Sequence, residues 1–189
     1  IKAVYASVFY QDSKAYMTAT KNVIDEEKMA IVLQEICGNA YGNRYYPSFS
    51  GVARSLNYYP IGAEQPEDGI ANIALGLGKY IVDGGMTLRF SPAYPHNALQ
   101  TSTLDFALRE TQTWFNALDL CQNCFVPQVD DGFNLLKVRV QDAMQDGTLK
   151  FIASTFDHQN GTIEDGLYEG RKVITFANIL KHDVFPLAA

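Results

Sequence analysis

Runs of apolar and β-branched residues in the first half of the chain predict strands. The longest run, 29–37 (MAIVLQEIC), predicts a buried strand. Shorter runs predict extended segments at 49–56, 69–75 and 86–90. The Gly- and Tyr-rich stretch 38–47 is typical of a loop or hairpin, and 58–68, with two prolines, of a surface loop.

Helical spacing of apolar residues predicts helices at 1–10 and 13–20, and a glycine turn at 76–78 leads into a short helix at 79–82. Residues 102–110 predict a helix with Thr103 or Ser102 as its N-cap. Another helix is predicted at 133–145, ended by Asp146-Gly147. Residues 111–120 fit either a strand or a helix, and their Thr, Trp and Phe residues favour a strand. The other runs predict strands at 149–156 and 172–176, and a terminal helix at 177–181.

This order of elements predicts an α+β fold, a mostly antiparallel sheet with flanking helices, because the strands follow one another in hairpin-like succession. The 189 residues fit one domain or one large lobe. Both ends are apolar, at Ile1–Tyr5 and Val184–Ala189, which leads us to expect a fragment of a longer polypeptide.

Composition and charge exclude several classes of protein. A hydrophobic content of 47% excludes a disordered acidic tail, and a formal net charge of −6 argues against a nucleic-acid-binding protein. No run approaches the roughly 18 apolar residues of a membrane span. Three cysteines, an odd and low number, indicate a reducing compartment, so we expect a cytoplasmic protein.

The cysteines and histidines give no metal site. Cys121 and Cys124 form a CxxC pair, but a closed zinc site needs four ligands and the sequence has no second pair, so we expect a structural pair of thiols. His96, His158 and His182 are scattered, with no Glu or His at ligand spacing.

The turn after 69–75 is the first candidate for chemistry. Gly76 and Gly78 allow a ligand to approach the backbone closely, and Lys79 adds a positive charge where a phosphate would lie at the helix start. The local pattern fits equally a tight strand-to-helix turn with an exposed lysine, and taken alone it favours that interpretation.

The pair of apolar strands at 29–37 and 49–56 is the second candidate, since the two can flank a slot the size of adenine. Gln34 and Glu35 interrupt the first run, and they either offer hydrogen bonds to a base edge or mark the solvent face. Ser50-Gly51 gives a small, accessible backbone position in the second strand.

Aromatic and basic side chains form the third candidate. Arginine with aromatics binds phosphates, bases or sugars, although a surface stacking patch or an interface is the commoner explanation. These residues are Tyr41, Arg44, Tyr45, Tyr46, Tyr58 and Tyr59.

Six short segments then follow one another in a distinctive order. They are Ala6-Ser7-Val8-Phe9, Ala15-Tyr16, Val32-Leu33-Gln34-Glu35-Ile36, Ser50-Gly51-Val52-Ala53-Arg54-Ser55, Ala74-Leu75-Gly76-Leu77-Gly78 and Val82-Asp83-Gly84-Gly85. In this order and spacing the chain resembles the nucleotide-binding domain that phosphoenolpyruvate synthases share with pyruvate phosphate dikinases. The resemblance covers roughly residues 1–95, about half of the chain.

The resemblance implies an ATP-grasp-like lobe at 1–95, the C-terminal part of such a nucleotide-binding domain, and an α+β extension of unknown function at 96–189. It implies ATP and Mg²⁺ as cofactors. The implied nucleotide contacts are Gln34, Glu35 and Ile36 beside adenine, Ser50 and Gly51 along the slot, and Gly76, Gly78 and Lys79 at the phosphates. In the family, ATP phosphorylates a histidine on a separate domain and the phosphoryl group passes to pyruvate. Further domains of a longer parent chain are therefore the implied partners, and pyruvate the implied acceptor.

Lys79 departs from the family pattern, because the family has a Glu at this position. A lysine cannot ligate Mg²⁺, so Lys79 either supplies positive charge directly or marks a site that binds nucleotide without turnover. Asp68 and Asn72 are the candidate oxygen ligands for the metal, although Asp68 also fits a solvated loop. The sequence identifies no catalytic residue.

Three functions follow, in order of preference. The first is part of an ATP-dependent phosphotransferase that resembles phosphoenolpyruvate synthase. The second is a degenerate nucleotide-binding or regulatory module, and the third is a structural interaction lobe that uses the tyrosines. We expect the chain alone to be inactive, because the resemblance places half of the nucleotide cleft before Ile1.

Overall fold

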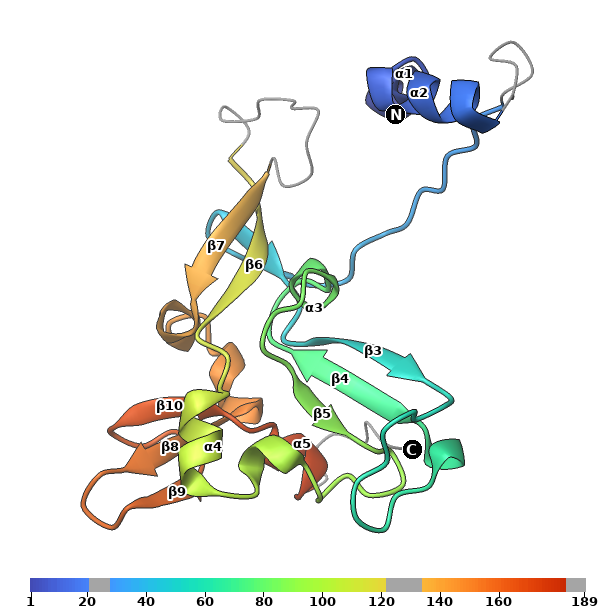
Figure 1. Cartoon of the computed structure of the whole chain (residues 1–189). Coiled ribbons are helices and arrows are strands. Elements are labelled where there is room, and N and C mark those ends of the chain that lie inside the picture. The colour runs from blue at the N-terminus through green and yellow to red at the C-terminus, as the bar shows by residue number, and fades with distance from the viewer. Residues whose placement is uncertain (21–27, 122–133, 183–189) are drawn as a thin grey trace. The chain divides into compact units, whose positions relative to one another are not determined.

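A computed structural model of the chain describes residues 1–20, 28–121 and 134–182 (Figure 1). They fall into two compact units, which we describe separately: residues 1–20 with 28–36, and residues 37–121 with 134–182. Every strand pairing in the described residues is antiparallel, and short helices connect the strands. The predicted α+β class is confirmed.

The first unit contains two helices, α1 (Lys2–Ser7) and α2 (Gln11–Thr20). Both were expected from helical spacing. The Ser13 hydroxyl donates to the Ser7 carbonyl at 2.7 Å and so ties the start of α2 to the end of α1. Met17 is buried on α2.

The predicted buried strand at 29–37 is wrong. Residues 28–36 have no regular secondary structure, and the side chains of Val32 and Leu33 are 82% and 76% exposed. An apolar run becomes a buried strand only where another strand pairs with it and another layer covers it. Neither is present around this run in the part of the chain that the structure describes.

Three antiparallel sheets build the second unit. The first has the order β1 (Asn39–Tyr41), β2 (Arg44–Tyr46), β6 (Trp114–Asp119) and β7 (Leu135–Arg139). The second has the order β3 (Ser50–Arg54), β4 (Ile70–Ala74) and β5 (Leu88–Phe90). The third has the order β10 (Arg171–Ile174), β8 (Ala153–Asp157) and β9 (Thr162–Asp165).

Short helices join these strands. The α-helices are α3 (Lys79–Val82), α4 (Leu104–Arg109) and α5 (Ala177–Leu180). The 3-10 turns are η2 (Pro66–Asp68), η3 (Leu99–Thr101), η4 (Val140–Met144) and η5 (Thr148–Phe151). Apolar side chains from all three sheets meet in one buried cluster, with Leu75 and Phe115 fully inaccessible to solvent. One core therefore holds the three sheets together.

The predicted helix at 133–145 is wrong. Its described part consists of β7 and η4. Val138 and Val140 are buried while Lys137 and Arg139 are exposed, so the burial alternates with the period of two that belongs to a strand. The sequence prediction also missed β9, whose four residues carry only one apolar side chain.

The first sheet contains residues from both sides of position 95, because β2 pairs with β6. The division into 1–95 and 96–189 stays a prediction. The CxxC pair reaches beyond residue 121 and lies outside the described residues. Among the described helices, none has the length and apolar character to cross a membrane.

Candidate functional site

The β3–β4 hairpin brings together two of the segments expected from the sequence. In this hairpin Ser50 faces Ala74 across the ladder, so the start of β3 lies beside the glycine turn that follows β4. The Ser50 hydroxyl donates a hydrogen bond to the Gly76 carbonyl at 2.7 Å. A Cβ placed on Gly78 would lie 3.9 Å from the side chain of Ser50. The Ser50 side chain therefore lies beside both Gly76, which is buried, and Gly78, which is partly exposed.

The glycine at position 76 allows the turn to pack closely on β6. Its φ is +89°, and an added Cβ would lie 2.7 Å from Cδ2 of Phe115 and 2.8 Å from the Asn116 carbonyl oxygen. The Leu77 N–H donates to the same carbonyl at 3.0 Å. Any larger side chain at position 76 would push the turn away from the sheet.

Gln112 fixes the other side of the turn. Its side-chain carbonyl accepts from the Leu75 N–H at 2.8 Å, and its amide nitrogen donates to the Leu75 carbonyl at 3.0 Å. The same nitrogen donates to the Trp114 carbonyl at 2.9 Å, and the residue is only 4% exposed. The amide replaces a neighbouring strand at this point, so the turn enters α3 in one fixed conformation.

Lys79 begins α3 directly after this turn. Its ammonium group lies 3.2 Å from Oδ1 of Asp83, one helical turn further on. The carboxylate thus offsets part of the charge that the sequence assigns to phosphate binding. The Lys79 side chain keeps about a third of its surface exposed, so it reaches solvent beside Gly78.

Buried Tyr80 packs α3 onto the sheet. Its ring contacts the ring of Trp114 edge-to-face at 4.7 Å, and its hydroxyl accepts from the Met86 N–H at 3.0 Å. Burial raises the pKa of the Tyr80 hydroxyl above its ordinary value. The phenol therefore stays protonated and acts as a structural support of the turn.

The three residues expected beside adenine, Gln34, Glu35 and Ile36, belong to the first unit. They lie in the exposed segment without regular structure and not in a hinge strand. Ser50, Gly51, Gly76, Gly78 and Lys79 lie in the second unit. The nucleotide roles of all these residues stay predictions.

The candidate metal ligands are both engaged in local contacts. The Asp68 carboxylate accepts from the Gln65 N–H at 2.7 Å and caps η2. Asn72 accepts from the Thr87 hydroxyl at 3.3 Å in the middle of β4. The described residues contain no cluster of three or more His, Cys, Asp or Glu side chains that could hold a metal ion. The roles of Asp68 and Asn72 as Mg²⁺ ligands stay predictions, because Mg²⁺ is commonly held by one or two protein oxygens together with water and substrate phosphates.

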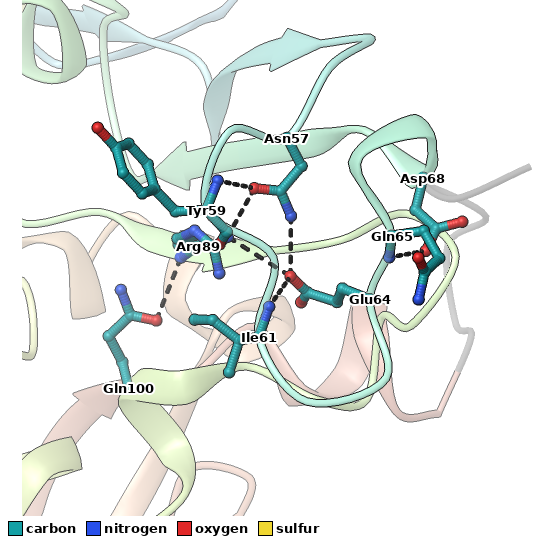
Figure 2. Close-up of polar contacts among 8 residues, drawn as sticks. All are labelled: Asn57, Tyr59, Ile61, Glu64, Gln65, Asp68, Arg89 and Gln100. Atoms are coloured by element: carbon teal, nitrogen blue, oxygen red, sulfur yellow. Dashed lines mark hydrogen bonds and ion pairs between the residues drawn. The ribbon is translucent and has the colours of Figure 1, made fainter.

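A buried polar cluster pins the loop between β3 and β4 (Figure 2). The Glu64 carboxylate accepts from the Asn57 side chain at 2.8 Å and from the Ile61 N–H at 3.0 Å. Arg89 on β5 donates to the Asn57 side chain at 3.0 Å and to the Tyr59 carbonyl at 2.7 Å, and its guanidinium lies 3.5 Å from Glu64. These contacts hold the loop against the edge of the sheet through charge-assisted hydrogen bonds.

The expected tyrosine and arginine patch divides into a buried part and an exposed part. Tyr46 is fully buried, and its hydroxyl donates to Asp146 at 2.5 Å, which also accepts from Arg44 at 2.8 Å. Tyr58 and Tyr59 are 70% and 83% exposed. The prediction of a single surface patch is therefore wrong, because Tyr46 belongs to the core.

Sequence reasoning missed Gln112, Glu64 and Arg89, which hold the turn and the loop in place. Each makes at least one contact with a residue far away in the chain: Gln112 and Leu75 are 37 positions apart, and Glu64 and Arg89 lie on different elements. The only sign of Gln112 in the sequence is its place as a polar residue beside an apolar run, in the segment TQTWF.

A comparison with protein families gives one match. The model described as the AMP/ATP-binding domain of pyruvate phosphate dikinase matches residues 1–110, more than half of the chain. No curated protein and no solved structure matches.

Proposed function

Because the chain belongs to the family of pyruvate phosphate dikinase AMP/ATP-binding domains, we propose that it binds the phosphates of an adenine nucleotide at the turn Gly76–Lys79. The observation that carries the proposal is the contact between Ser50 and Gly76. It joins two of the segments on which the family resemblance rests, and both lie inside the matched residues. The turn leaves room for close approach of an anion at Gly78, where the nearest side-chain atom is 3.9 Å from a Cβ position.

Two features of the turn suit phosphate. The glycine at position 78 allows an anion to approach the backbone closely, and the lysine beside it adds a positive charge. The rigid support from Gln112 and Asn116 keeps these groups in position before a ligand arrives, which lowers the entropy cost of binding. Lys79 turns from Asp83 toward the phosphate when the nucleotide binds.

In a longer parent protein, the nucleotide would supply the phosphoryl group for a reaction of the phosphoenolpyruvate synthase type. We propose pyruvate as the acceptor and a histidine on another domain as the carrier. The sequence identifies no catalytic acid or base for that reaction in this chain. The chain contributes binding and orientation, which are the main requirements of phosphoryl transfer.

A second candidate function is a nucleotide-binding module without turnover. Lys79 favours it, because this residue replaces the family's carboxylate and is paired with Asp83. Such a module would bind nucleotide as a regulatory signal.

Binding is tested by titrating ATP into the natural polypeptide that carries this chain and measuring the heat of binding. Gly78→Val places two methyl groups over the turn, and we expect it to weaken ATP binding at least about tenfold. Ala63→Val is the matched control, because Ala63 is exposed on a loop outside the turn. The absence of saturable binding, or equal affinities of the Gly78→Val variant and the natural protein, would contradict the proposal.

Turnover separates the two candidate functions. If the polypeptide forms phosphoenolpyruvate from pyruvate and Mg-ATP, it is a phosphotransferase. Saturable ATP binding without this product identifies the non-catalytic module. A Lys79→Glu variant with unchanged ATP affinity would count against any role of the lysine in binding.

A further inference from the structure

A pocket lies in the part of the chain beyond the family match. It has a volume of about 480 Å³ and is formed at the start of β6, the end of β7 and the start of β10. All of its lining residues come after position 110. It is therefore separate in sequence from the proposed nucleotide turn.

Positive charge is concentrated in this pocket. Its lining includes Lys137 and Arg139 from β7 and Arg171 and Lys172 from β10. The whole chain has 15 lysines and arginines and a net charge of −6, so four cations in one pocket are a strong local reversal of sign. No Asp or Glu is found among the described residues that line it.

Within the described parts of the chain, none of these four cations forms an ion pair with a carboxylate. Arg171 donates to the Leu108 carbonyl at 2.8 Å, and Lys172 donates to the Thr155 hydroxyl at 3.3 Å. Lys172 also donates to the Tyr168 carbonyl, which does not line the pocket. Lys137, Arg139 and Arg171 are exposed, so water solvates their charges and leaves them accessible to an anion.

Trp114 forms one wall of the pocket. The Lys137 ammonium lies 4.0 Å from the centre of its ring, a cation–π contact that holds the lysine at the pocket. Arg139 is paired with Trp114 across the β6–β7 ladder, so both β7 cations are placed by the same tryptophan. Threonine and glutamine side chains of the lining, such as Gln141, add neutral hydrogen-bonding groups.

We propose that this pocket binds a small molecule that carries at least two phosphate charges, such as a diphosphate group. Guanidinium groups form paired hydrogen bonds to phosphate oxygens, and lysines add point charges around them. Phosphate groups supply several negative charges in a small volume, which matches a group of lysines and arginines better than a monocarboxylate does. A nucleic acid fits less well, because the cations line a concave pocket of a protein whose overall charge is negative.

The pocket is connected to the nucleotide turn through shared side chains. Gln112 lines the pocket and holds both backbone groups of Leu75. Trp114 lines the pocket and packs against Tyr80 of α3. A ligand in the pocket would thus contact the residues that support the proposed nucleotide turn.

Trp114 also provides the measurement, because it is the only tryptophan in the sequence. Inorganic pyrophosphate is titrated into the protein at constant ionic strength while tryptophan fluorescence is recorded. We expect a saturable change of emission, with inorganic phosphate binding at least about tenfold more weakly than pyrophosphate. Sodium chloride at the same ionic strength should give no saturable change.

Two double variants test the cations from each strand separately. Lys137→Gln with Arg139→Gln, and Arg171→Gln with Lys172→Gln, should each weaken pyrophosphate binding at least about tenfold. Arg109→Gln with Lys150→Gln is the matched control, because it removes the same charge at exposed positions outside the pocket. Circular dichroism verifies that all three variants are folded, and calorimetry provides a signal that does not depend on the contact between Lys137 and Trp114.

The proposal is wrong if pyrophosphate gives no saturable signal below about 10 mM by either method. It is also wrong if the control pair weakens binding as much as the pocket pairs, since general attraction would then explain the result. The Gly78→Val variant separates this pocket from the nucleotide turn. Pyrophosphate binding should survive that substitution, and its loss there would assign the signal to the nucleotide turn.

Discussion

At the residue scale, Gly76 and Gly84 differ in what surrounds them. Both have a positive φ, +89° and +80°, but only Gly76 would bring a Cβ against Phe115 and the Asn116 carbonyl. Gly84→Ala should destabilise the fold by about 1 kcal/mol, the cost of a left-handed alanine. Gly76→Ala should cost about 3 kcal/mol, because overpacking is added. Urea denaturation measures the free energy of unfolding of both variants. An equal loss in the two would show that the close packing of the turn does not contribute to stability.

Gln112 gives a second prediction at this scale. Gln112→Ala removes three hydrogen bonds and leaves the N–H and carbonyl of Leu75 buried without partners. We expect a loss of about 3 kcal/mol in the free energy of unfolding. Gln141→Ala, an exposed glutamine that lines the same pocket, should change it by less than about 0.5 kcal/mol. Similar effects in chemical denaturation would refute the bracing role of Gln112.

Glycines that permit turns could be recognised in the sequence, while the residues that brace them could not. Gly76 and Gly78 belong to a local strand–turn–helix pattern, and the structure places them as that pattern predicts. Gln112 acts on a turn 37 residues away, and its role depends on the pairing of β6 within another sheet. Local spacing contains no information about such a contact.

At the scale of elements, the helix α4 begins at an N-cap for which the sequence left two candidates, Ser102 and Thr103. The structure selects Thr103, whose hydroxyl accepts from the Phe106 N–H at 3.3 Å. Thr103→Ala should lower stability by about 1 kcal/mol, and the neighbouring Ser102→Ala should have little effect. Thermal denaturation measures the stability of both variants. A larger loss of stability in the Ser102 variant than in the Thr103 variant would show that Ser102 is the N-cap.

The β3–β4 loop depends on Glu64. Glu64→Ala removes the acceptor of Asn57 and Ile61 and leaves Arg89 partly buried without its carboxylate, so we expect a loss of about 3 kcal/mol. Limited proteolysis should then cut the loop faster. Glu67→Ala, in the same loop but exposed, is the control. Unchanged cleavage of the Glu64 variant would mean that other contacts hold the loop.

Most strands of the second unit could be predicted from apolar alternation, but two segments could not. Residues 135–140 alternate, yet their leucines and valines also fit helical spacing, and only pairing with β6 decides between the two. Residues 29–37 have the apolar pattern of a strand but form none, and most apolar side chains of this run are exposed in the first unit. Strand prediction fails where the pairing partner, rather than the run itself, determines the structure.

At the scale of the whole molecule, two buried phenols make stability depend on alkaline pH. Burial raises the pKa of Tyr46 and Tyr80 above 10, so both keep their protons in the folded state while the unfolded chain ionises near pH 10. The contribution of the two phenols to the free energy of unfolding is fully present below pH 10 and is lost as the pH rises toward the pKa of the folded state. The slope is at most about 1.4 kcal/mol per pH unit for each group.

Tyr80→Phe should therefore reduce the loss of stability between pH 9 and about 11, although the variant is less stable at pH 8 because the Met86 N–H loses its acceptor. Tyr16→Phe, an exposed tyrosine on α2, should leave the slope unchanged. Urea midpoints across this pH range provide the measurement. An unchanged slope in the Tyr80 variant would contradict the assignment.

The pairing of β2 with β6 has a consequence for synthesis on the ribosome. Arg44 lies opposite Asp119, so the open side of the 39–46 hairpin has no neighbour until a segment some 75 residues later has left the exit tunnel. At a translation rate of roughly 5–20 residues per second, this strand edge waits for several seconds. During that time its unpaired backbone is available to other nascent chains and to chaperones. Slow codons after position 46 would prolong that exposure, and slow codons after β6 has emerged would give the sheet time to close.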